Sequence, residues 1–329
     1  MPLILAIESS CDETSVAILS EKKILSNIVL SQIEIHQRYG GVVPEIAARH
    51  HLKNLPPIYK EAVKQADIDV SKIDAVAVTT GPGLMGALLV GISFAKGLAV
   101  SLRKPLIGVN HLLGHVYAAH LSYADLTPPY LALLVSGGHT ELLIFEGPLQ
   151  PKLLGRTLDD AAGEAFDKVA RLLNIGYPGG PAIEKISKDG DPHRYSFPKA
   201  MLEKDNFNFS FSGLKTSVLY LLQKQKNLSV CDVAASFQEA VVDVLVEKAA
   251  NALQTTGLRK LVVSGGVASN TRLREKLSQK TEEMGIELYI PPRSLCTDNA
   301  AMIARAAFEM FNAGVSSPLS VTADPALSF

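Results

Sequence analysis

The sequence has no tryptophan, only three cysteines and almost no excess of charge of either sign. Cys11, Cys231 and Cys296 lie far apart and form no CxxC pair, which argues against a disulfide framework and indicates a reducing compartment. The 32 basic and 33 acidic residues give a formal charge of −1, so the chain as a whole is not a polycation that clamps phosphates. Any contact with a nucleic acid must therefore be local.

Long uninterrupted hydrophobic runs are also lacking. The longest apolar stretch, Leu84 to Leu102, contains Lys96 and three glycines, whereas a membrane span needs about 18 uninterrupted apolar residues. The first residues are apolar only briefly and lack the basic leader of a secretory signal. We expect a cytoplasmic protein with no membrane segment.

An internal repeat is the most informative feature that the sequence does have. The segment LAIESSCDETSVAIL, starting at Leu5, aligns with LLVSGGHTELLIF, starting at Leu133. Each copy is typical of two strands joined by a tight turn of small residues. Because 329 residues are enough for roughly two domains, the repeat predicts two lobes of similar build.

The boundaries of the lobes follow from the position of the second copy. The first lobe is predicted to span residues 1–128 and 296–329, and the second to span residues 129–295. Pro128 and Pro129 mark the join just before the second copy.

Strand and helix signals alternate between the two copies, from a strand at residues 75–80 to a helix beginning at His111. This order is typical of parallel strands covered by helices, so the predicted fold class is α/β. A last helix, from about Asp298 to Asn312 and with Asp298 in an N-cap position, is expected to return to the first lobe.

Two VSGG turns follow apolar strands, at residues 135–138 and 263–266. Paired glycines at the end of a strand let the backbone approach a ligand and direct its N–H groups toward an anion. One such turn alone would more often be an ordinary connection, but two of them, with the related turn at residues 9–13, favour a nucleotide site. The pattern GxxxxGK[ST] does not occur, so the common phosphate-loop fold lacks its fingerprint.

Two histidines have the spacing of metal ligands. His111 and His115 are four residues apart in a predicted helix, which puts both imidazoles on one face about 6 Å apart. Asp298 is a candidate third ligand if the last helix returns to the first lobe. The alternative is that one or both histidines are ordinary surface or core residues.

A metallopeptidase is a possible function for such a pair, but its usual base is missing. Zincins place a glutamate directly after the first histidine, in HExxH, and this sequence has Leu112 there. A peptidase built on these histidines would lack the group that activates the metal-bound water.

Ten blocks in order along almost the whole chain carry a resemblance to a known family. They are ESSCDETS at Glu8, GGVVPEIAARHH at Gly40, TTGPGLMGALLVG at Thr79, NHLLGH at Asn110, LVSGGHT at Leu134, GEAFDKVARLL at Gly163, YPGGP at Tyr177, FSFSGLKT at Phe209, SGGVASN at Ser264 and CTDNAAMIA at Cys296. Together they resemble the bacterial tRNA N6-adenosine threonylcarbamoyltransferases (TsaD), once labelled sialoglycoprotein endopeptidases. The family belongs to the actin, Hsp70 and sugar-kinase superfamily, so the resemblance implies two ribonuclease H-like or actin-like ATPase lobes.

The resemblance implies an activity and a cofactor. Members transfer a threonylcarbamoyl group from threonylcarbamoyl-adenylate to N6 of the tRNA adenosine just after the anticodon, in tRNAs that read codons beginning with adenine, and release AMP. His111, His115 and Asp298 match the metal ligands of the family, and either iron, which we expect, or zinc suits this donor set. Leu134 stands where archaeal and eukaryotic relatives carry a tyrosine that can join the metal, so a three-ligand site is implied.

The resemblance also implies how an adenine nucleotide or the adenylate is bound. It would lie against the loop formed by Leu134, Val135, Ser136, Gly137 and Gly138. Asp167 and Glu184 would lie near the ribose, Gly180 would allow close backbone approach, and Asn270 would lie beside the adenine. Taken alone, the two carboxylates would more often belong to a solvated helix face.

An acidic turn at the mouth of the first hairpin supplies candidates for proton transfer. Asp12 and Glu13 are placed to accept the proton that the adenosine amine loses. The alternative is a simple capped turn.

One segment combines positive charge with aromatic rings. Residues 193–226 hold six basic and two acidic side chains, a net of +4, together with six aromatic rings, which suits a phosphate track with base stacking. Lys199, Lys204 and Lys215 are the candidate tRNA contacts. The alternative is that the rings are core and the lysines a solvated face.

Partners follow from the resemblance as well. The chain is expected to act on tRNA with a TsaC-type synthase that supplies the adenylate, a TsaB paralogue that pairs through the first lobe, and the P-loop ATPase TsaE. The stretch from Leu84 to Leu102 is either a partner face or a buried helix. The competing function is a nucleotide-dependent scaffold of the actin or Hsp70 kind that hydrolyses ATP.

Overall fold

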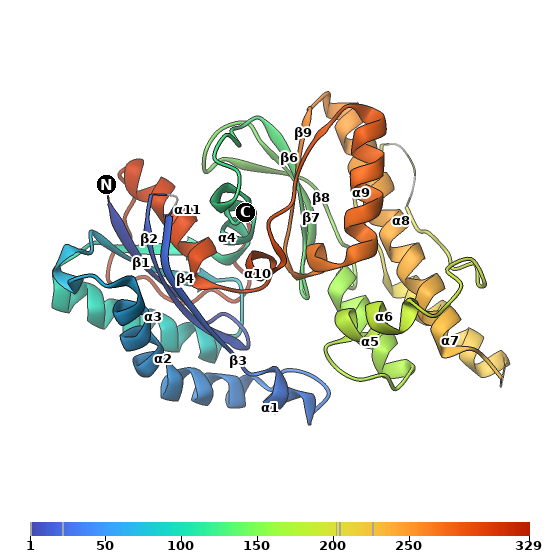
Figure 1. Ribbon diagram of the computed structural model, residues 1–329, viewed down its shortest axis with the longest axis horizontal. Coiled ribbons are helices and arrows are strands. Elements are labelled where there is room, and N and C mark those ends of the chain that lie inside the picture. Colours follow the sequence, from blue (N-terminus) through green and yellow to red (C-terminus); the bar gives the residue numbers. More distant parts are fainter. Residues whose placement is uncertain (1, 22, 202, 204, 226) are drawn as a thin grey trace. The chain divides into compact units, whose positions relative to one another are not determined.

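The computed structural model describes residues 2–21, 23–201, 203, 205–225 and 227–329, and the chain divides into two compact units. Unit 1 comprises Met1–Leu126 and Thr297–Phe329, and unit 2 comprises Thr127–Cys296. The observed divisions, after Leu126 and after Cys296, lie beside the predicted ones. Both units are built from a mixed sheet covered by helices, so the predicted α/β class is confirmed (Figure 1).

The sheet of unit 1 has the strand order β3-β2-β1-β4-β5. β1 pairs antiparallel with β2 and parallel with β4, which in turn pairs parallel with β5. The carboxyl ends of β1, β4 and β5 therefore meet at one edge of the sheet. The strands are β1 (Leu3–Glu8), β2 (Glu13–Ser20), β3 (Lys23–Ser31), β4 (Ala75–Gly81) and β5 (Leu106–Asn110).

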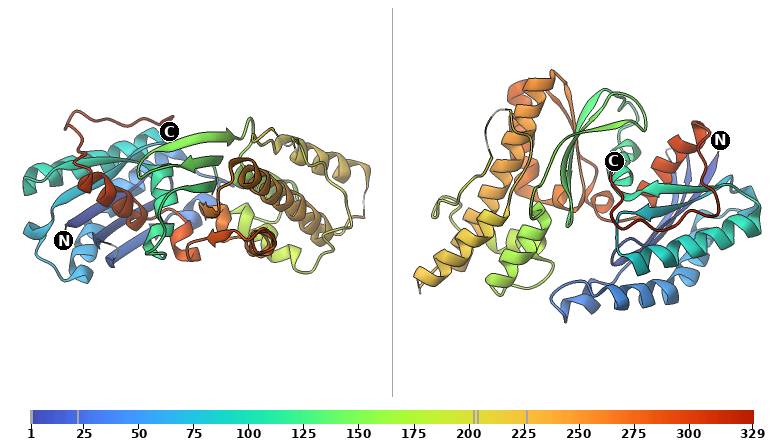
Figure 2. Two further views of the ribbon diagram at one scale, coloured as in Figure 1. Left: turned by 90° about the horizontal axis from the view of Figure 1, so that it is seen from above. Right: turned by 180° about the vertical axis from the view of Figure 1, so that it is seen from behind.

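Helices cover both faces of this sheet. Figure 2 shows α2 and α3 side by side on one face, where they bury the apolar side chains of alternate strand residues, while α11 packs against β1, β2 and α4 on the other. The helices of unit 1 are α1 (Ile33–Gln37), α2 (Pro44–Ala66), η1 (Val70–Lys72), α3 (Met85–Leu102), α4 (His111–Tyr117), η2 (Ala119–Leu121) and α11 (Ala300–Asn312).

Helix α3 accounts for the longest apolar stretch of the sequence. Among the described residues it alone is long and apolar enough to cross a membrane. Leu88, Ile92 and Ala95 are buried in the core of unit 1, whereas Met85 and Val100 are exposed. The helix therefore buries one side in the core and exposes apolar side chains on the other. The expectation of a buried helix holds for the buried side alone, and the exposed side stays a candidate partner face.

The sheet of unit 2 repeats the topology of unit 1, with the order β10-β9-β6-β7-β8. β6 takes the place of β1, because it pairs antiparallel with β7 and parallel with β9. The internal repeat predicted two lobes of similar build, and the repeated topology confirms it; the ribonuclease H-like class was implied by the family resemblance. The strands are β6 (Tyr130–Val135), β7 (Thr140–Phe145), β8 (Pro151–Arg156), β9 (Lys260–Ser264) and β10 (Glu287–Tyr289).

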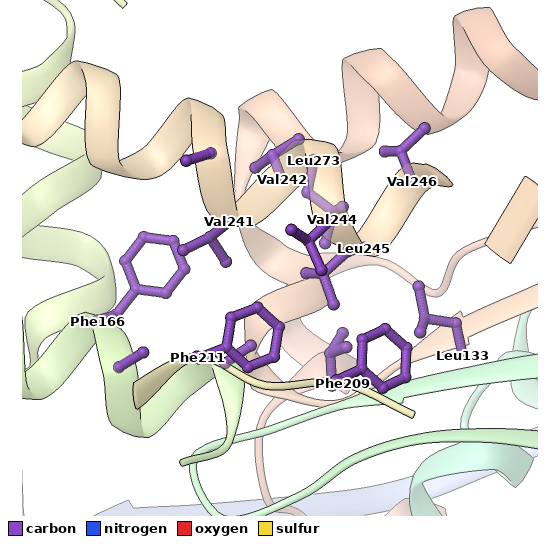
Figure 3. Packing of buried hydrophobic residues seen from close by; sticks show 14 of the residues in the cluster. Leu133, Phe166, Phe209, Phe211, Val241, Val242, Val244, Leu245, Val246 and Leu273 are labelled. Carbon is purple, nitrogen blue, oxygen red and sulfur yellow. The ribbon is translucent and has the colours of Figure 1, made fainter. Parts of the chain in front are cut away.

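The helices of unit 2 enclose a large apolar core, part of which is drawn in Figure 3. Phe209 and Phe211 stack in this core, and Phe197 is also buried in it. For these rings the core interpretation is therefore correct, whereas Tyr220 is exposed. The helices are α5 (Ala162–Leu172), α6 (Gly179–Ser187), α7 (Ser212–Lys224), α8 (Val230–Thr256), η3 (Gly266–Ser269), α9 (Thr271–Met284) and α10 (Arg293–Cys296).

Truncating a central ring of this core should destabilise the protein measurably. Phe237 on α8 is fully buried and meets Phe166 edge to face, with ring centroids 5.4 Å apart. Phe237→Ala should lower the free energy of unfolding by about 3–5 kcal/mol, because it removes buried area and leaves a cavity. Denaturant unfolding followed by circular dichroism measures this, with the exposed Tyr220→Ala as a control expected within about 0.5 kcal/mol of the wild type. Equal stability of the two variants would contradict the assignment of this core.

Candidate functional site

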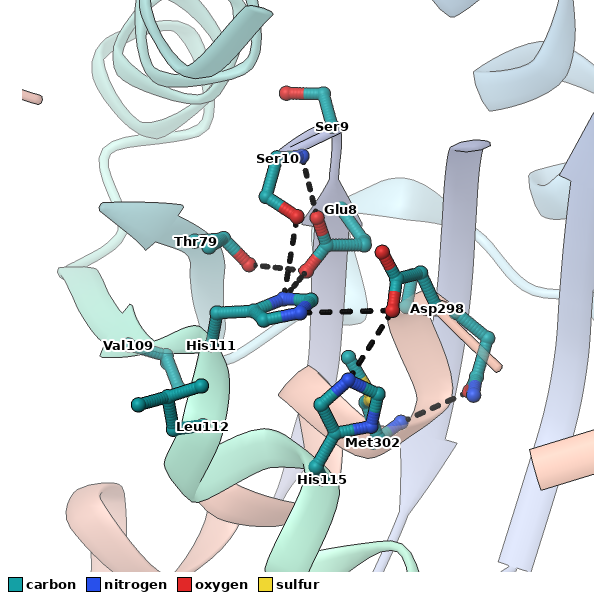
Figure 4. Close-up of polar contacts among 12 residues, drawn as sticks. Glu8, Ser9, Ser10, Thr79, Val109, His111, Leu112, His115, Asp298 and Met302 are labelled. Carbon is teal, nitrogen blue, oxygen red and sulfur yellow. Dashed lines mark hydrogen bonds and ion pairs between the residues drawn. The ribbon is translucent and has the colours of Figure 1, made fainter. Parts of the chain in front are cut away.

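The candidate metal site lies at the shared edge where the parallel strands of unit 1 end. β5 ends at Asn110, and α4 begins at the next residue, His111. The side chain of Asn110 caps this helix by accepting a hydrogen bond from the Leu112 N–H at 2.8 Å. His115 follows one turn later, and the two imidazole centroids lie 4.6 Å apart. Both rings are buried, and Figure 4 shows them beside Asp298.

Asp298 reaches the histidines from the segment that precedes α11. The prediction that Asp298 caps this helix is wrong, because Asn299 is the N-cap and accepts a hydrogen bond from Met302 N–H at 3.1 Å. The first turn of α11 is tied to the sheet by Ser15 Oγ, which accepts from Ala300 N–H at 2.9 Å. With the cap supplied by its neighbour, the carboxylate of Asp298 is free to face the imidazoles.

The three predicted ligands come together in the structure. Oδ1 of Asp298 lies 3.1 Å from Nε2 of His115 and 3.5 Å from Nε2 of His111. One ligand atom from each residue lies within 4.8 Å of the other two. Nδ1 of His115 makes no hydrogen bond with any described residue, although the ring is buried. Two imidazoles and a carboxylate with an orphaned buried nitrogen fit a single iron or zinc ion.

Charge is unevenly distributed over this cluster. Burial opposes a positive charge on His111, but Asp298 and Glu8 outweigh it and hold the pKa of His111 well above its ordinary value. Burial would raise the pKa of Asp298, but attraction by His111 and hydrogen bonding hold it far below its ordinary value. Burial lowers the pKa of His115. Without a metal, these shifts favour a positively charged His111 beside a neutral His115 and an ionised Asp298.

The acidic turn between β1 and β2 lies in the same unit and is contacted by His51 of α2. Nε2 of His51 lies 2.9 Å from the carbonyl oxygen of Cys11, and Nδ1 of His51 lies 2.8 Å from the hydroxyl of Thr14. Burial, together with the charges of Asp298 and Asp12, raises the pKa of Glu13 to about 9. The carboxyl of Glu13 therefore carries a proton at neutral pH.

Two glycine turns lie beside each other in unit 2, because the strands that they follow, β6 and β9, are paired. Gly265 has φ +91°, and a Cβ at this position would lie 2.4 Å from the carbonyl oxygen of Val135, so only glycine fits. In the other turn, Ser136 N–H donates to His139 O at 2.8 Å, and the space around Gly137 and Gly138 is open. Leu134 and Val135 are buried strand residues, paired with β7 and, at Leu134, also with β9.

The other residues predicted to bind the nucleotide also lie in unit 2. Asp167 on α5 accepts a hydrogen bond from Gly179 N–H at 2.7 Å, at the start of α6 and next to Gly180. Glu184 lies on the same helix, and its carboxylate accepts a hydrogen bond from the side-chain amide of Asn270 at 3.4 Å. In the structure Glu184 therefore contacts Asn270, and Asp167 contacts Gly179, the residue beside Gly180.

Two neighbours of this group were missed in the sequence. The amide of Asn270 also donates to Gln238 Oε1 at 2.8 Å, and Thr271 N–H donates to Glu184 Oε1 at 3.2 Å. Thr271 directly follows the SGGVASN block, and Gln238 is a polar residue inside the apolar sequence of α8. The adjacency of Thr271 and the isolated polarity of Gln238 were the signals available.

The metal site also includes residues that the sequence analysis did not single out. Glu8, the last residue of β1, is fully buried with Oε2 3.0 Å from Nδ1 of His111. Thr79 and Ser10 contact the same carboxylate. The signal was a carboxylate at the end of an otherwise apolar strand.

The candidate tRNA contacts differ in their surroundings. Lys199 is exposed and forms an ion pair with Asp243 on α8, with Nζ 2.6 Å from Oδ2. Lys215 is half-buried on α7. Lys204 lies outside the described residues.

Metal affinity of the triad should fall as the pH falls. The ligand is neutral imidazole, and the raised pKa of His111 means that a metal must displace a proton from it at neutral pH. Affinity should therefore rise with pH until the pH passes the raised pKa of His111, and binding should release a proton. Competition titration of metal-depleted protein with Zn²⁺ at several pH values measures this. An affinity that does not change between about pH 6 and 8 would contradict the assignment, since an ordinary histidine already titrates there.

Comparison with known proteins gives a consistent result over the whole chain. The model of the family "TsaD: tRNA N6-adenosine threonylcarbamoyltransferase" matches residues 23–305. Proteins named tRNA N6-adenosine threonylcarbamoyltransferase from Thermotoga neapolitana and Thermosipho africanus are each 56% identical, over 326 and 327 residues, with 99% of both chains covered in each case. Among solved structures, full-length HypF in its phosphate- and nucleotide-bound form matches with a TM-score of 0.65 and 16% identity, over 96% of this chain and 47% of HypF. That likeness shows the fold.

Proposed function

Because the chain belongs to the tRNA N6-adenosine threonylcarbamoyltransferase family, we propose that it transfers a threonylcarbamoyl group to N6 of an adenosine in tRNA. The donor is threonylcarbamoyl-adenylate, and the acceptor is the adenosine just after the anticodon in tRNAs that read codons beginning with adenine. Identity of 56% over nearly the full length of a named transferase is the observation that carries this proposal.

The reaction needs the protein to position the substrates and to stabilise charge, and it needs no nucleophile from the protein. The donor is a mixed anhydride, so its carbamoyl carbon is already activated. The N6 amine attacks this carbon, the bond to the phosphate oxygen breaks, AMP leaves and the amine loses a proton. Residues that orient the two substrates therefore account for most of the catalysis.

His111, His115 and Asp298 would hold the metal. When bound, a divalent ion supplies Lewis acidity and a binding point for the threonyl part of the donor. Two imidazoles and one carboxylate leave coordination positions open for a substrate, as a catalytic site requires. We expect iron in the cell, and zinc satisfies the same donor set.

Unit 2 would bind the adenylate part of the donor. The N–H groups of the turn that contains Gly137 and Gly138 are suited to its phosphate, because the space around these glycines is open. Asp167, Glu184 and Asn270 provide the acceptors and the amide that would bind ribose and adenine. Gly180 has no neighbouring atom where a side chain would be, which allows close approach.

The acidic turn would take up the proton of the amine. Because the pKa of Glu13 is raised to about 9, that carboxyl already carries a proton at neutral pH. We therefore assign acceptance of the proton to Asp12 and assign to Glu13 a hydrogen bond from its protonated carboxyl.

The partners and location belong to the same proposal. A TsaC-type synthase would supply the adenylate, a TsaB paralogue would pair with unit 1, and TsaE would act on the assembled complex in the cytoplasm. Met85, Leu89 and Val100 on α3 are exposed apolar side chains that suit the TsaB contact.

Formation of the modified nucleoside tests the function. The purified chain is mixed with its partners, threonylcarbamoyl-adenylate and unmodified tRNA, and the digested tRNA is analysed by mass spectrometry. The wild type should form threonylcarbamoyladenosine, and His111→Ala should lose at least about 100-fold in rate, because several kcal/mol of metal stabilisation are removed. His193→Ala, which changes an exposed histidine, is the matched control. ATP hydrolysis without any modified nucleoside would favour the scaffold function instead.

Charge reversal on α7 tests the tRNA contact. Lys215→Glu should weaken tRNA binding and reduce the slope of log affinity against log salt by about 1, because one phosphate contact is lost. Lys72→Glu, at an exposed lysine of η1, serves as the control for a general change in charge. Filter binding at several salt concentrations measures both. Equal effects of the two variants would remove α7 from the interface.

A further inference from the structure

Glu8 contacts His111 on the side of the ring that faces away from Asp298. Oε2 of Glu8 lies 3.0 Å from Nδ1 of His111, whereas Nε2 of the same ring lies 3.5 Å from Oδ1 of Asp298 (Figure 4). Glu8 is 0% exposed. Each nitrogen of this imidazole therefore has one carboxylate as its neighbour, Glu8 at Nδ1 and Asp298 at Nε2.

The carboxylate of Glu8 is fixed by donors from two other positions. Ser10 N–H donates to Oε1 at 2.5 Å, and the hydroxyl of Thr79, on β4, donates to Oε2 at 2.6 Å. The two oxygens of this buried side chain are thus faced by Ser10 N–H, the Thr79 hydroxyl and Nδ1 of His111, the surroundings that favour an ionised carboxylate. A buried ionised carboxylate with this many donors is held in one orientation.

The hydrogen-bond pattern decides which nitrogen of His111 carries the proton. A bare Nδ1 would direct its lone pair at an ionised oxygen 3.0 Å away, which is repulsive. Nδ1 must therefore carry hydrogen and donate to Glu8, with Ser10 Oγ at 3.2 Å as a second neighbour. In the neutral ring this leaves the lone pair on Nε2, the atom nearer Asp298.

We propose that Glu8 is a positioning residue that holds His111 in its Nδ1–H form and so presents Nε2 to the metal. A carboxylate behind a ligating histidine fixes the orientation of the ring and makes the ligand more basic. Among the described residues His115 has no such partner at Nδ1, so this control acts on one ligand only. The inference rests on the proposed metal function of the triad, and Glu8 acts through His111 without touching the metal.

Glu8→Gln separates this role from a structural one. Glutamine has the same shape but only one acceptor oxygen, so its amide nitrogen must replace Oε1, next to Ser10 N–H, or Oε2, next to His111. The first orientation sets the amide against another donor, Ser10 N–H, so the second is favoured: the amide donates to Nδ1 and moves the proton of His111 to Nε2, which can then no longer bind a metal. Asp74→Asn is the matched control, because Asp74 Oδ2 accepts a hydrogen bond from Leu3 N–H at 2.8 Å at the opposite end of β1 and makes no contact with His111.

The experiment measures Zn²⁺ affinity of the full chain by competition titration, together with the nitrogen shifts of ¹⁵N-labelled histidine. Glu8→Gln should weaken Zn²⁺ binding about 10–100-fold, while Asp74→Asn stays within about 3-fold of the wild type. At a pH where the ring of His111 is neutral without metal, His111 should give the Nδ1–H signature in the wild type and lose it in Glu8→Gln. Equal affinities for wild type and Glu8→Gln, or equal losses in both variants, would overturn the proposal.

The wild-type spectrum keeps the outcome interpretable if a variant fails. At a pH where His111 of the metal-free wild type is neutral, an Nε2–H signature overturns the role of Glu8 even if Glu8→Gln does not fold. Absence of Zn²⁺ binding by the folded wild type contradicts the proposed metal function, and the Nδ1–H signature then still reports whether Glu8 sets the tautomer. The two failures are therefore distinguishable.

Discussion

The attraction between Asp298 and the two histidines of α4 is the interaction on which the site of unit 1 depends. The two imidazoles are buried and Asp298 is partly buried, so an unpaired charge on any of them would be costly. The sheet makes the arrangement possible, because the parallel strands β1, β4 and β5 end at one edge and carry Glu8, Thr79 and His111 to it. Asp298 joins them because the first turn of α11 is bonded to the sheet.

Unit 2 uses the same topology for a different chemistry. Where unit 1 places charged side chains at the strand ends, unit 2 places glycines, whose backbone N–H groups suit a phosphate. The two glycine turns pack closely, because a Cβ on Gly265 would overlap the backbone of Val135 and only glycine fits there. One duplicated sheet therefore provides a side-chain site in one unit and a backbone site in the other.

The sequence predicted local features well and distant ones poorly. The spacing of His111 and His115 follows from helix geometry, and it is observed. The cap of α11 was misplaced by one residue, because aspartate and asparagine cap equally well and the choice is made by tertiary contacts of Ser15 and Asn27. Glu8 was missed because its role exists only when β1, β4 and α4 come together. Whether the rings of Phe209 and Phe211 belong to a binding surface or to the core stayed open, because composition does not reveal burial.

The central claim is that an ion held by His111, His115 and Asp298 takes part in the transfer reaction. The most direct measurement titrates metal-depleted protein with Fe²⁺ or Zn²⁺ in a single-turnover reaction with threonylcarbamoyl-adenylate and tRNA. The rate of nucleoside formation should rise with bound metal and level off at one ion per chain. Full activity in protein shown by elemental analysis to be free of metal would contradict it.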